Sequence, residues 1–367
     1  MTSLHGPRAL RRLAAAAVVL AIASSLADRP AAAADDAATA DGTAISVDEL
    51  DNTIEAFAGQ GVLGLSIDAD TSTVGADGAR TTLTVLIQNV LSAGLLDSLG
   101  VEPLADSDRD EQFQALVASQ PQFGQLDDHG QQVVTDNVVQ FGQLDDVTVD
   151  DLGDLESRYE ASPAGLGVVC AQLFTATDSD AAVDAVNALA DGDEFADVES
   201  RYGVPDDTIE QATEGTDAGA PAGDDATSGD TTNTSGDTTT AGDPGTDASA
   251  PTASSEPADA SAFSCTPLRS FASLGADVTA PLLEVPAGAA AVVDTGSGVY
   301  VLDIGSYDEV SAPLHDVLSS PPPSASGSAE SLGRMLLDGY MATADVSVNP
   351  RYGRWDPLSG SVVALDT

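Results

Sequence analysis

The chain lacks lysine altogether and is poor in aromatic residues and in cysteine. Its 12 bases are all arginines, and 60 acidic residues oppose them, which gives a formal net charge of −48. A surface this negative repels phosphate backbones and anionic lipids, so we expect no nucleic-acid partner. Aromatic residues make up 4% of a chain that is 42% hydrophobic, so a core must consist mainly of Ala, Val and Leu.

Sequence motifs of serine hydrolases and of nucleoside-triphosphate-binding loops are also missing. The sequence has no Gly-x-Ser-x-Gly elbow and no phosphate-binding GxxxxGK loop. After the N-terminal region, the histidines are His129, expected in a loop, and His315, expected on a helix surface. Two Asp-rich segments, at 68–72 and 106–110, begin like EF-hand loops but lack the required glycine and the final glutamate. We expect no metal and no cofactor.

The N-terminal region is typical of a secretory signal. Three arginines between residues 8 and 12 precede a mostly apolar stretch over residues 13–26, and small residues precede Asp35. We interpret residues 1–34 as a signal peptide and expect the mature chain to begin near Asp35; a retained N-terminal anchor is the alternative. No later run reaches about 18 apolar residues, so we expect no stable membrane span after signal removal. The expected localisation is exported, either extracellular or in the cell envelope.

Cys170 and Cys265 are the two cysteines of the chain. Two cysteines in an exported chain favour one disulfide, and two unpaired buried thiols are the alternative. The two cysteines are 95 positions apart (265 − 170). A disulfide that closes a loop of this length would stabilise the fold by roughly 4–5 kcal/mol in the chain-entropy model. Metal binding by two distant cysteines without a histidine cluster is not expected.

Residues 206–262 differ in composition from the sequence on both sides. They contain no aromatic and no basic residue and consist largely of Asp, Glu, Thr, Ser, Gly, Ala and Pro. Such a segment buries too little apolar surface to offset its chain entropy. We therefore expect a disordered acidic insertion that is dispensable for folding.

Helical patterns dominate residues 40–160. Ser46 and Glu49 form a capping-box signal before apolar residues at helical spacing, and further helices are expected around residues 83–95, 113–117 and 152–159. The sequence QFGQLDD occurs twice, at 122–128 and 140–146. The offset would place both copies on one face if the helix were continuous, although Gly130 and Gly142 leave its continuity open. We interpret the repeat as a packing motif.

A different pattern follows Pro163. A strand is expected at 168–174, a helix at 182–189, and a short helix from 195. Residues 290–294 and 299–304 read as two strands of a hairpin, and 329–343 as a helix. These elements predict an α+β fold, with a small α+β domain that the acidic insertion interrupts.

Several short segments resemble the exported SurA-like and PrsA-like chaperones, which carry a parvulin-type peptidyl-prolyl isomerase domain. In chain order the segments are DGTAISV (41–47), VCAQLF (169–174), LADGDEFA (189–196), PAG (286–288), TGSGVY (295–300) and VNPRYGRWD (348–356). The resemblance implies a helical SurA-N-like chaperone domain over 35–163. It also implies a parvulin-like domain over 164–305, interrupted at 206–262. Residues 306–367 would form a linker, helix and tail packed on the chaperone domain.

The resemblance implies a protein-folding factor whose partners are unfolded or extended polypeptides, including proline-containing segments. The family places one active-site histidine on the first strand of the isomerase domain and one on the last, where this chain has Leu173 and Tyr300. Isomerase activity is therefore expected to be weak or lost, with an active isomerase or a non-catalytic secreted scaffold as alternatives. Phe174, Phe195 and Phe271 are the expected peptide-binding residues.

Overall fold

The computed structural model describes residues 35–65, 74–205, 263–274, 276–296, 298–322 and 330–365. The expected signal peptide, the expected acidic insertion and the first Asp-rich segment lie outside these residues. The second Asp-rich segment forms the first turn of a helix. Within the described residues, no helix is long and apolar enough to cross a membrane. Contacts join the chain up to Gly203 and from Phe263 onward into one unit.

The region before Pro163 is helical, as the sequence predicts. Its helices are α2 (Val47–Gly59), α3 (Ala76–Ser98), α4 (Asp106–Ser119), α5 (Asp128–Asp145) and α6 (Leu155–Ala161), with 3-10 turns η2 (Val62–Gly64), η3 (Pro121–Gln125) and η4 (Val149–Leu152). The expected cap at Ser46 is present, because its hydroxyl accepts a hydrogen bond of 3.0 Å from the backbone N–H of Glu49. Such a bond satisfies one of the four free N–H groups at a helix start.

The two copies of QFGQLDD do not share one helix. Pro121 holds the first copy in η3, and Asp127 then caps α5 by accepting a hydrogen bond of 2.8 Å from Gly130 N–H. The second copy, by contrast, lies at the end of the α-helix α5. The leucines of both copies, Leu126 and Leu144, are nevertheless buried in the same core, so the repeat packs without being continuous. His129, expected in a loop, lies in the first turn of α5.

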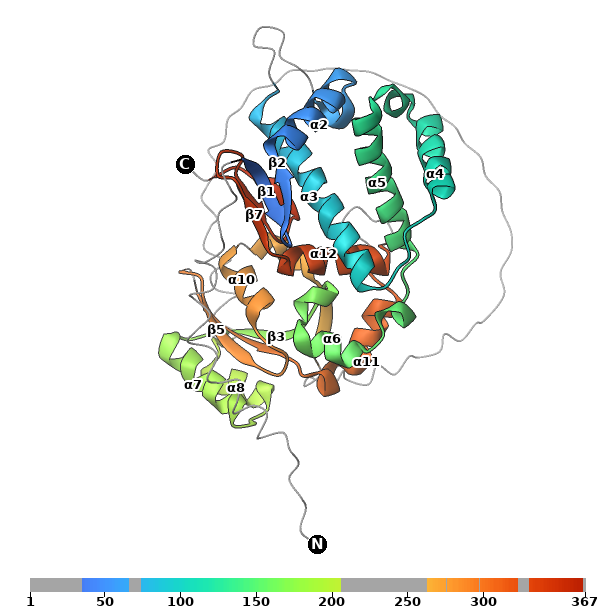
Figure 1. The fold of residues 1–367 in the computed structure, drawn as a ribbon. Helices are drawn as coiled ribbons and strands as arrows, with labels where there is room; N and C mark the ends of the chain where they lie inside the picture. The colour runs from blue at the N-terminus through green and yellow to red at the C-terminus, as the bar shows by residue number, and fades with distance from the viewer. Residues whose placement is uncertain are drawn as a thin grey trace, which may run out of the picture. The chain divides into compact units, whose positions relative to one another are not determined.

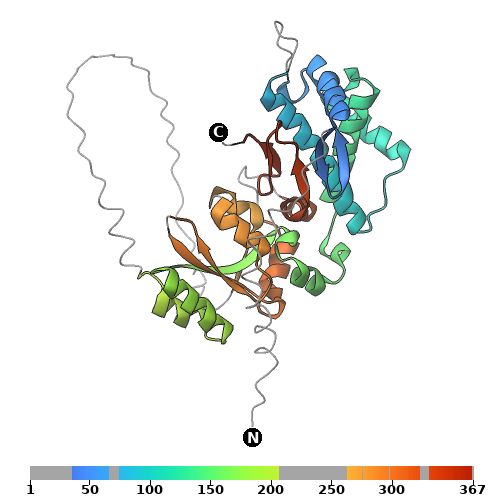
Figure 2. The ribbon, with the colours of Figure 1, turned by 60° about the vertical axis from the view of Figure 1, so that its left-hand side comes forward.

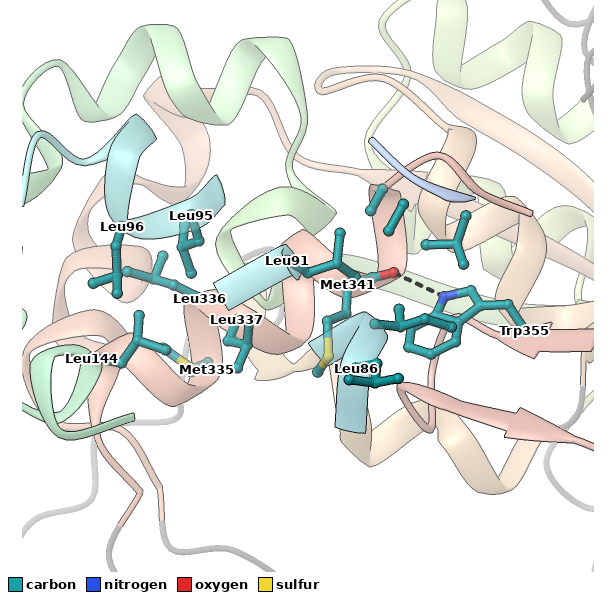
Figure 3. Close-up of a cluster of buried hydrophobic side chains, with 14 of the residues drawn as sticks. Leu86, Leu91, Leu95, Leu96, Leu144, Met335, Leu336, Leu337, Met341 and Trp355 are labelled. Atoms are coloured by element: carbon teal, nitrogen blue, oxygen red, sulfur yellow. Dashed lines mark hydrogen bonds between the residues drawn. The ribbon is translucent and has the colours of Figure 1, made fainter. Parts of the chain in front are cut away.

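The two ends of the described chain meet in a three-stranded antiparallel sheet (Figure 1). Strand β1 (Asp36–Ala40) pairs with β2 (Thr43–Ser46) on one side and with β7 (Val346–Val348) on the other. Helix α12 (Leu332–Thr343) precedes β7 and packs against α3 and α5. Figure 3 shows leucines of α3 and α5 meeting methionines and leucines of α12 in the main core.

The chain's tail contributes its single tryptophan to this core. Strand β8 (Arg354–Asp356) pairs with β9 (Ser361–Val363), and Trp355 of β8 is buried. Its indole N–H donates a hydrogen bond of 3.3 Å to the carbonyl oxygen of Met341 (Figure 3). The tail is therefore anchored to α12 through both burial and a hydrogen bond.

A second antiparallel sheet has the strand order β4-β3-β6-β5. Its strands are β3 (Val168–Ala176), β4 (Ser264–Pro267), β5 (Ala290–Asp294) and β6 (Val299–Ile304). The strand at 168–174 and the later hairpin are as predicted, whereas no sequence pattern predicted β4. Together with the helices, these antiparallel sheets confirm an α+β fold.

Helices cover both faces of the second sheet (Figures 1 and 2). The helices α7 (Ser179–Ala190) and α8 (Phe195–Tyr202) contact strands β3, β5 and β6 from one side. The 3-10 helix η6 (Leu268–Leu274) and α10 (Ala276–Glu284) belong to the core on the other side. The 3-10 turn η5 (Ala164–Leu166) and helix α11 (Tyr307–Ser319) flank β3 and β4. Each face of the sheet therefore has its own apolar cluster.

Candidate functional site

The register of β3 on β6 sorts the predicted site residues onto two faces. Leu173 lies opposite Leu302, Thr175 lies opposite Tyr300, and Phe174 lies opposite Val301. Side chains of directly paired residues share a face, and successive residues alternate. Leu173 and Tyr300 are therefore on one face of the sheet, and Phe174 is on the other.

On the face covered by α7 and α8, Phe174 and Phe195 are packed together. Phe174 is only 5% exposed, and the two ring centroids are 5.4 Å apart in an edge-to-face arrangement. Val198 and Val301, both fully buried, belong to the same cluster. The two phenylalanines form part of the core here and line no cavity described below.

The opposite face holds an apolar cavity of about 210 Å³ between the sheet, η6 and α10. Hydrocarbon side chains dominate its wall, and two hydroxyls come from β4. The lining residues are Val169, Ala171, Leu173, Ser264, Thr266, Phe271, Leu282, Val293 and Leu302. Leu173 is 44% exposed, which makes it one of the few large apolar side chains open to solvent in the described chain. An apolar hole with an exposed apolar side chain at its wall can accept a hydrocarbon side chain from another molecule.

The structure thus brings together some of the predicted site residues and separates others. Leu173 and Phe271 both line the cavity, whereas Tyr300 packs against the same apolar cluster without lining the cavity. Phe174 and Phe195 lie on the far face of the sheet. Sequence reasoning missed Leu282 of α10 and Val293 of β5. Val293 could have been found, because it lies in the predicted strand 290–294, where strand alternation assigns each residue to a face. No sequence pattern pointed to Leu282, because Pro281 interrupts the helical pattern of its segment.

The cavity contains no group suited to proton transfer or metal binding. None of its lining side chains is titratable, and the described residues hold no cluster of three metal-binding side chains. His315 is exposed on α11, and His129 Nε2 lies 2.8 Å from the hydroxyl of Thr53. Because that hydroxyl donates to the carbonyl of Glu49, His129 is the donor in this bond. The cavity can therefore bind an apolar group, and its walls supply no acid or base.

A disulfide holds the strand that forms one wall of the cavity. Cys170 and Cys265 are bonded directly across the β3–β4 pair, with Cα atoms 3.9 Å apart, which confirms the predicted bridge. Their neighbours in both strands line the cavity, whereas Cys170 itself faces the main core. The bridge therefore ties β4, a strand of only four residues, to the centre of the sheet.

A second cavity, of about 640 Å³, is lined by charged side chains where α12 meets α5 and η6. Arg334 donates to both carboxylate oxygens of Asp145, at 3.0 and 3.2 Å, and its guanidinium lies 4.0 Å from the ring centroid of Phe141. Arg269 forms ion pairs with Glu330 and, at 3.4 Å, with Asp338. Each arginine in this cavity is thus already paired, and we interpret the cluster as a tie between η6, α5 and α12.

The two aspartates of this cavity have pKa values shifted in opposite directions. The hydrogen bonds from Arg334 are the main cause that lowers the pKa of Asp145, assisted by Ser331 and opposed by desolvation. For Asp338 desolvation is the largest cause and raises the pKa, while Arg269 and Arg334 act against it. By linkage, the charge of Asp145 stabilises the folded state above its unfolded pKa of about 3.9, and the charge of Asp338 destabilises it there.

We expect Asp338→Asn to raise the free energy of unfolding at neutral pH and Asp145→Asn to lower it. Asp145 is half exposed, so its loss should stay within about 1 kcal/mol. The gain from Asp338→Asn should disappear as pH falls below about 3.9, where the wild-type carboxyl is neutral in both states. The loss from Asp145→Asn should disappear at still lower pH, below its lowered folded-state pKa. Urea unfolding at pH 7 and pH 3 checks this, and equal signs at pH 7 would contradict it.

Comparisons with known proteins give little more. No family model matches the sequence, and no curated protein matches it. A search of solved structures finds a crystal structure of PrsA from Bacillus subtilis. The two chains are 13% identical, the alignment covers 77% of this chain and 84% of that chain, and the TM-score is 0.20. A superposition at that TM-score is too poor to relate the two folds.

Proposed function

We propose that this chain is an exported protein-folding factor that binds unfolded or proline-containing polypeptide segments. The observation that carries the proposal is the apolar cavity of about 210 Å³ with the exposed side chain of Leu173 at its wall. The site offers hydrocarbon contact and no reactive group, which suits reversible binding of an apolar side chain or a proline ring. Export is supported by the disulfide, because such bonds form and persist in oxidising compartments.

The sequence resemblance to SurA-like and PrsA-like chaperones supports the same function. Two of the segments that carry it, 169–174 and 295–300, contribute to the neighbouring strands β3 and β6, next to the cavity. In this proposal residues 164–305 form the parvulin-like domain around the cavity. Residues 35–163 form the chaperone domain, on which α12 and the tail of the C-terminal part 306–367 pack, while α11 flanks β3 and β4. The helical part would bind further lengths of the same unfolded chain.

Isomerase activity of this site is proposed to be weak or lost. Leu173, where the family has a histidine, is apolar and cannot join a polar network. Tyr300, at the second position, packs against the apolar cluster of this face and does not line the cavity. An apolar pocket that holds a proline ring could still favour a twisted amide, so the rate with a proline peptide needs to be measured.

The test is suppression of aggregation of a chemically denatured protein, together with affinity for a proline-containing peptide. We expect Phe271→Ala to weaken peptide binding about ten-fold, as loss of a central aromatic contact does in other interfaces. Val183→Ala is the matched control, since Val183 is 52% exposed on α7, across the sheet from the cavity. Equal affinities of both variants and the wild type would refute the proposed site. A wild-type chain that neither suppresses aggregation nor binds the peptide would refute the function.

The isomerisation rate of the same peptide separates the folding factor from an active isomerase. We expect the wild-type chain to accelerate isomerisation little or not at all. A strong acceleration that Phe271→Ala removes would show that the cavity is catalytic. Suppression of aggregation together with a slow rate would support binding without turnover.

A further inference from the structure

One stretch of β3 has a neighbouring strand on only one side. β4 pairs with β3 over Val168–Ala171, and the bridge between Ala176 and Gly203 closes the same side near the other end of β3. Between them, among the described residues, Gln172 to Thr175 pair with β6 alone. Within the part of the chain that the structure describes, the sheet therefore has a short open edge, in line with β4.

The ladder alternation shows which backbone groups this edge presents. Gly305 N–H donates to the carbonyl of Cys170 at 3.0 Å, so Cys170 directs its backbone groups toward β6. In an antiparallel pair this direction alternates with each residue, so those of Gln172 and Phe174 also face β6. The N–H and C=O groups of Leu173 and the N–H of Thr175 then point away from β6, to the open side.

The edge lies next to the apolar cavity. Leu173 contributes both backbone groups to the edge and its side chain to the cavity wall. A strand added beside Leu173 would place the side chain of its opposite residue on the same sheet face, which is the face of the cavity. Natural proteins protect exposed edges with proline, lysine or bulges, and Gln172 to Thr175 include none of these.

We propose that a client polypeptide binds by adding a short extended strand to the open edge of β3, with one apolar side chain in the cavity. This rests on the proposed function and names its binding mode. Backbone hydrogen bonds to Leu173 and Thr175 provide affinity without sequence preference, and the cavity selects an apolar side chain at one position. With a net charge of −48 on the chain, the preferred segment is neutral or cationic rather than acidic.

The test uses the full wild-type chain and a short peptide of alternating valine and threonine between lysine pairs. Each backbone N–H of the peptide is methylated in turn, and the dissociation constant is measured by calorimetry. We expect about a ten-fold loss at the one position whose N–H donates to the C=O of Leu173, and little change at the positions next to it, whose N–H groups point away from β3. Replacing valine with serine should weaken binding at the same position that does not tolerate methylation. The peptide residue opposite Leu173 directs its N–H toward β3 and its side chain toward the cavity.

Two protein variants test the edge from the other side. Leu173→Pro removes the N–H from which a peptide carbonyl would accept, and should bind the peptide about ten-fold more weakly than Leu173→Ala does. The loss caused by methylation should remain, because residue 173 keeps its C=O. Proline is tolerated where a strand N–H faces outward. Leu173→Ala keeps both backbone groups, so the same methylation-sensitive position should persist, at an affinity below that of the wild type. The methylation series on the wild-type chain decides the question even where the proline variant does not fold.

The failures are distinguishable. A wild-type chain that binds no unmodified peptide overturns the proposed function and the strand addition together. Binding that is equally tolerant of methylation at all positions overturns strand addition and leaves peptide binding intact. Strong protection of the Leu173 amide from hydrogen exchange in the free protein would show that the chain's own residues already occupy the edge, which also overturns it.

Discussion

Removal of the Cys170–Cys265 disulfide is expected to lower the free energy of unfolding by several kcal/mol. The bridge closes a loop with a sequence separation of 95 residues, for which the chain-entropy model gives roughly 4–5 kcal/mol, although native strain often reduces the gain. The affinity for peptides should fall in the same experiment, because the bridge holds β4 and β4 forms part of the cavity wall. Urea unfolding and peptide calorimetry with and without reductant measure both effects.

The double variant with alanine at both positions is the control for this prediction. Alanine avoids placing a serine hydroxyl at the fully buried Cys170 site, where an unpaired polar group would add its own cost. Reductant should change the wild type and leave the double variant unaffected. An unchanged urea midpoint in the reduced wild type would show that β3 and β4 remain paired without the bond. Lower stability with unchanged peptide affinity would show that the disulfide stabilises the fold but does not maintain the cavity.

Elements with strong local signals could be predicted from the sequence. The cap at Ser46 and the apolar spacing that follows it define α2, and the glycines between 290–294 and 299–304 mark the hairpin of β5 and β6. The disulfide followed from cysteine count and the expected compartment. In each case a few neighbouring residues, or a chemical constraint, decide the outcome. Tertiary packing then agrees with the local preference.

Elements that depend on a distant partner could not be predicted. Strand β4 has four residues with little alternation, and its place in the sheet depends on pairing with β3. The two QFGQLDD copies do not share one helix for a local reason, because Pro121 and the cap at Asp127 end one element and start another between the copies. Pro121 lies just before the first copy and is not part of the repeated sequence. The two copies therefore have identical sequences but different secondary structures.

The candidate site shows the same division. Leu173 and Phe174 are adjacent in the sequence, so strand alternation alone placed them on opposite faces, and only one of them could line a given pocket. Which face carries the cavity was not predictable. It depends on η6 and α10, whose positions against the sheet result from long-range packing. Phe271 and Leu282 enter the site in this way.

Gly339→Ala is expected to destabilise the fold by about 3 kcal/mol or more, despite the higher helix propensity of alanine. In α12 a Cβ at this position would lie 2.2 Å from Gly167 N and 2.4 Å from the carbonyl oxygen of Ala164. Both atoms are backbone atoms of the segment around η5, so no flexible side chain can move aside. Helix α12 would have to separate from η5, and the core between them would lose packing. Urea unfolding measures the loss.

Gly142→Ala provides the matched control, because it is the same substitution in a helix where the added Cβ has room. Its nearest neighbour would be Gln112 Oε1 at 3.5 Å, an ordinary van der Waals contact. There the helix propensity of alanine should dominate and raise the free energy of unfolding by up to about 1 kcal/mol. The two variants should therefore change stability with opposite signs. A stabilising effect at both positions would mean that α12 does not approach η5 as closely as these distances require.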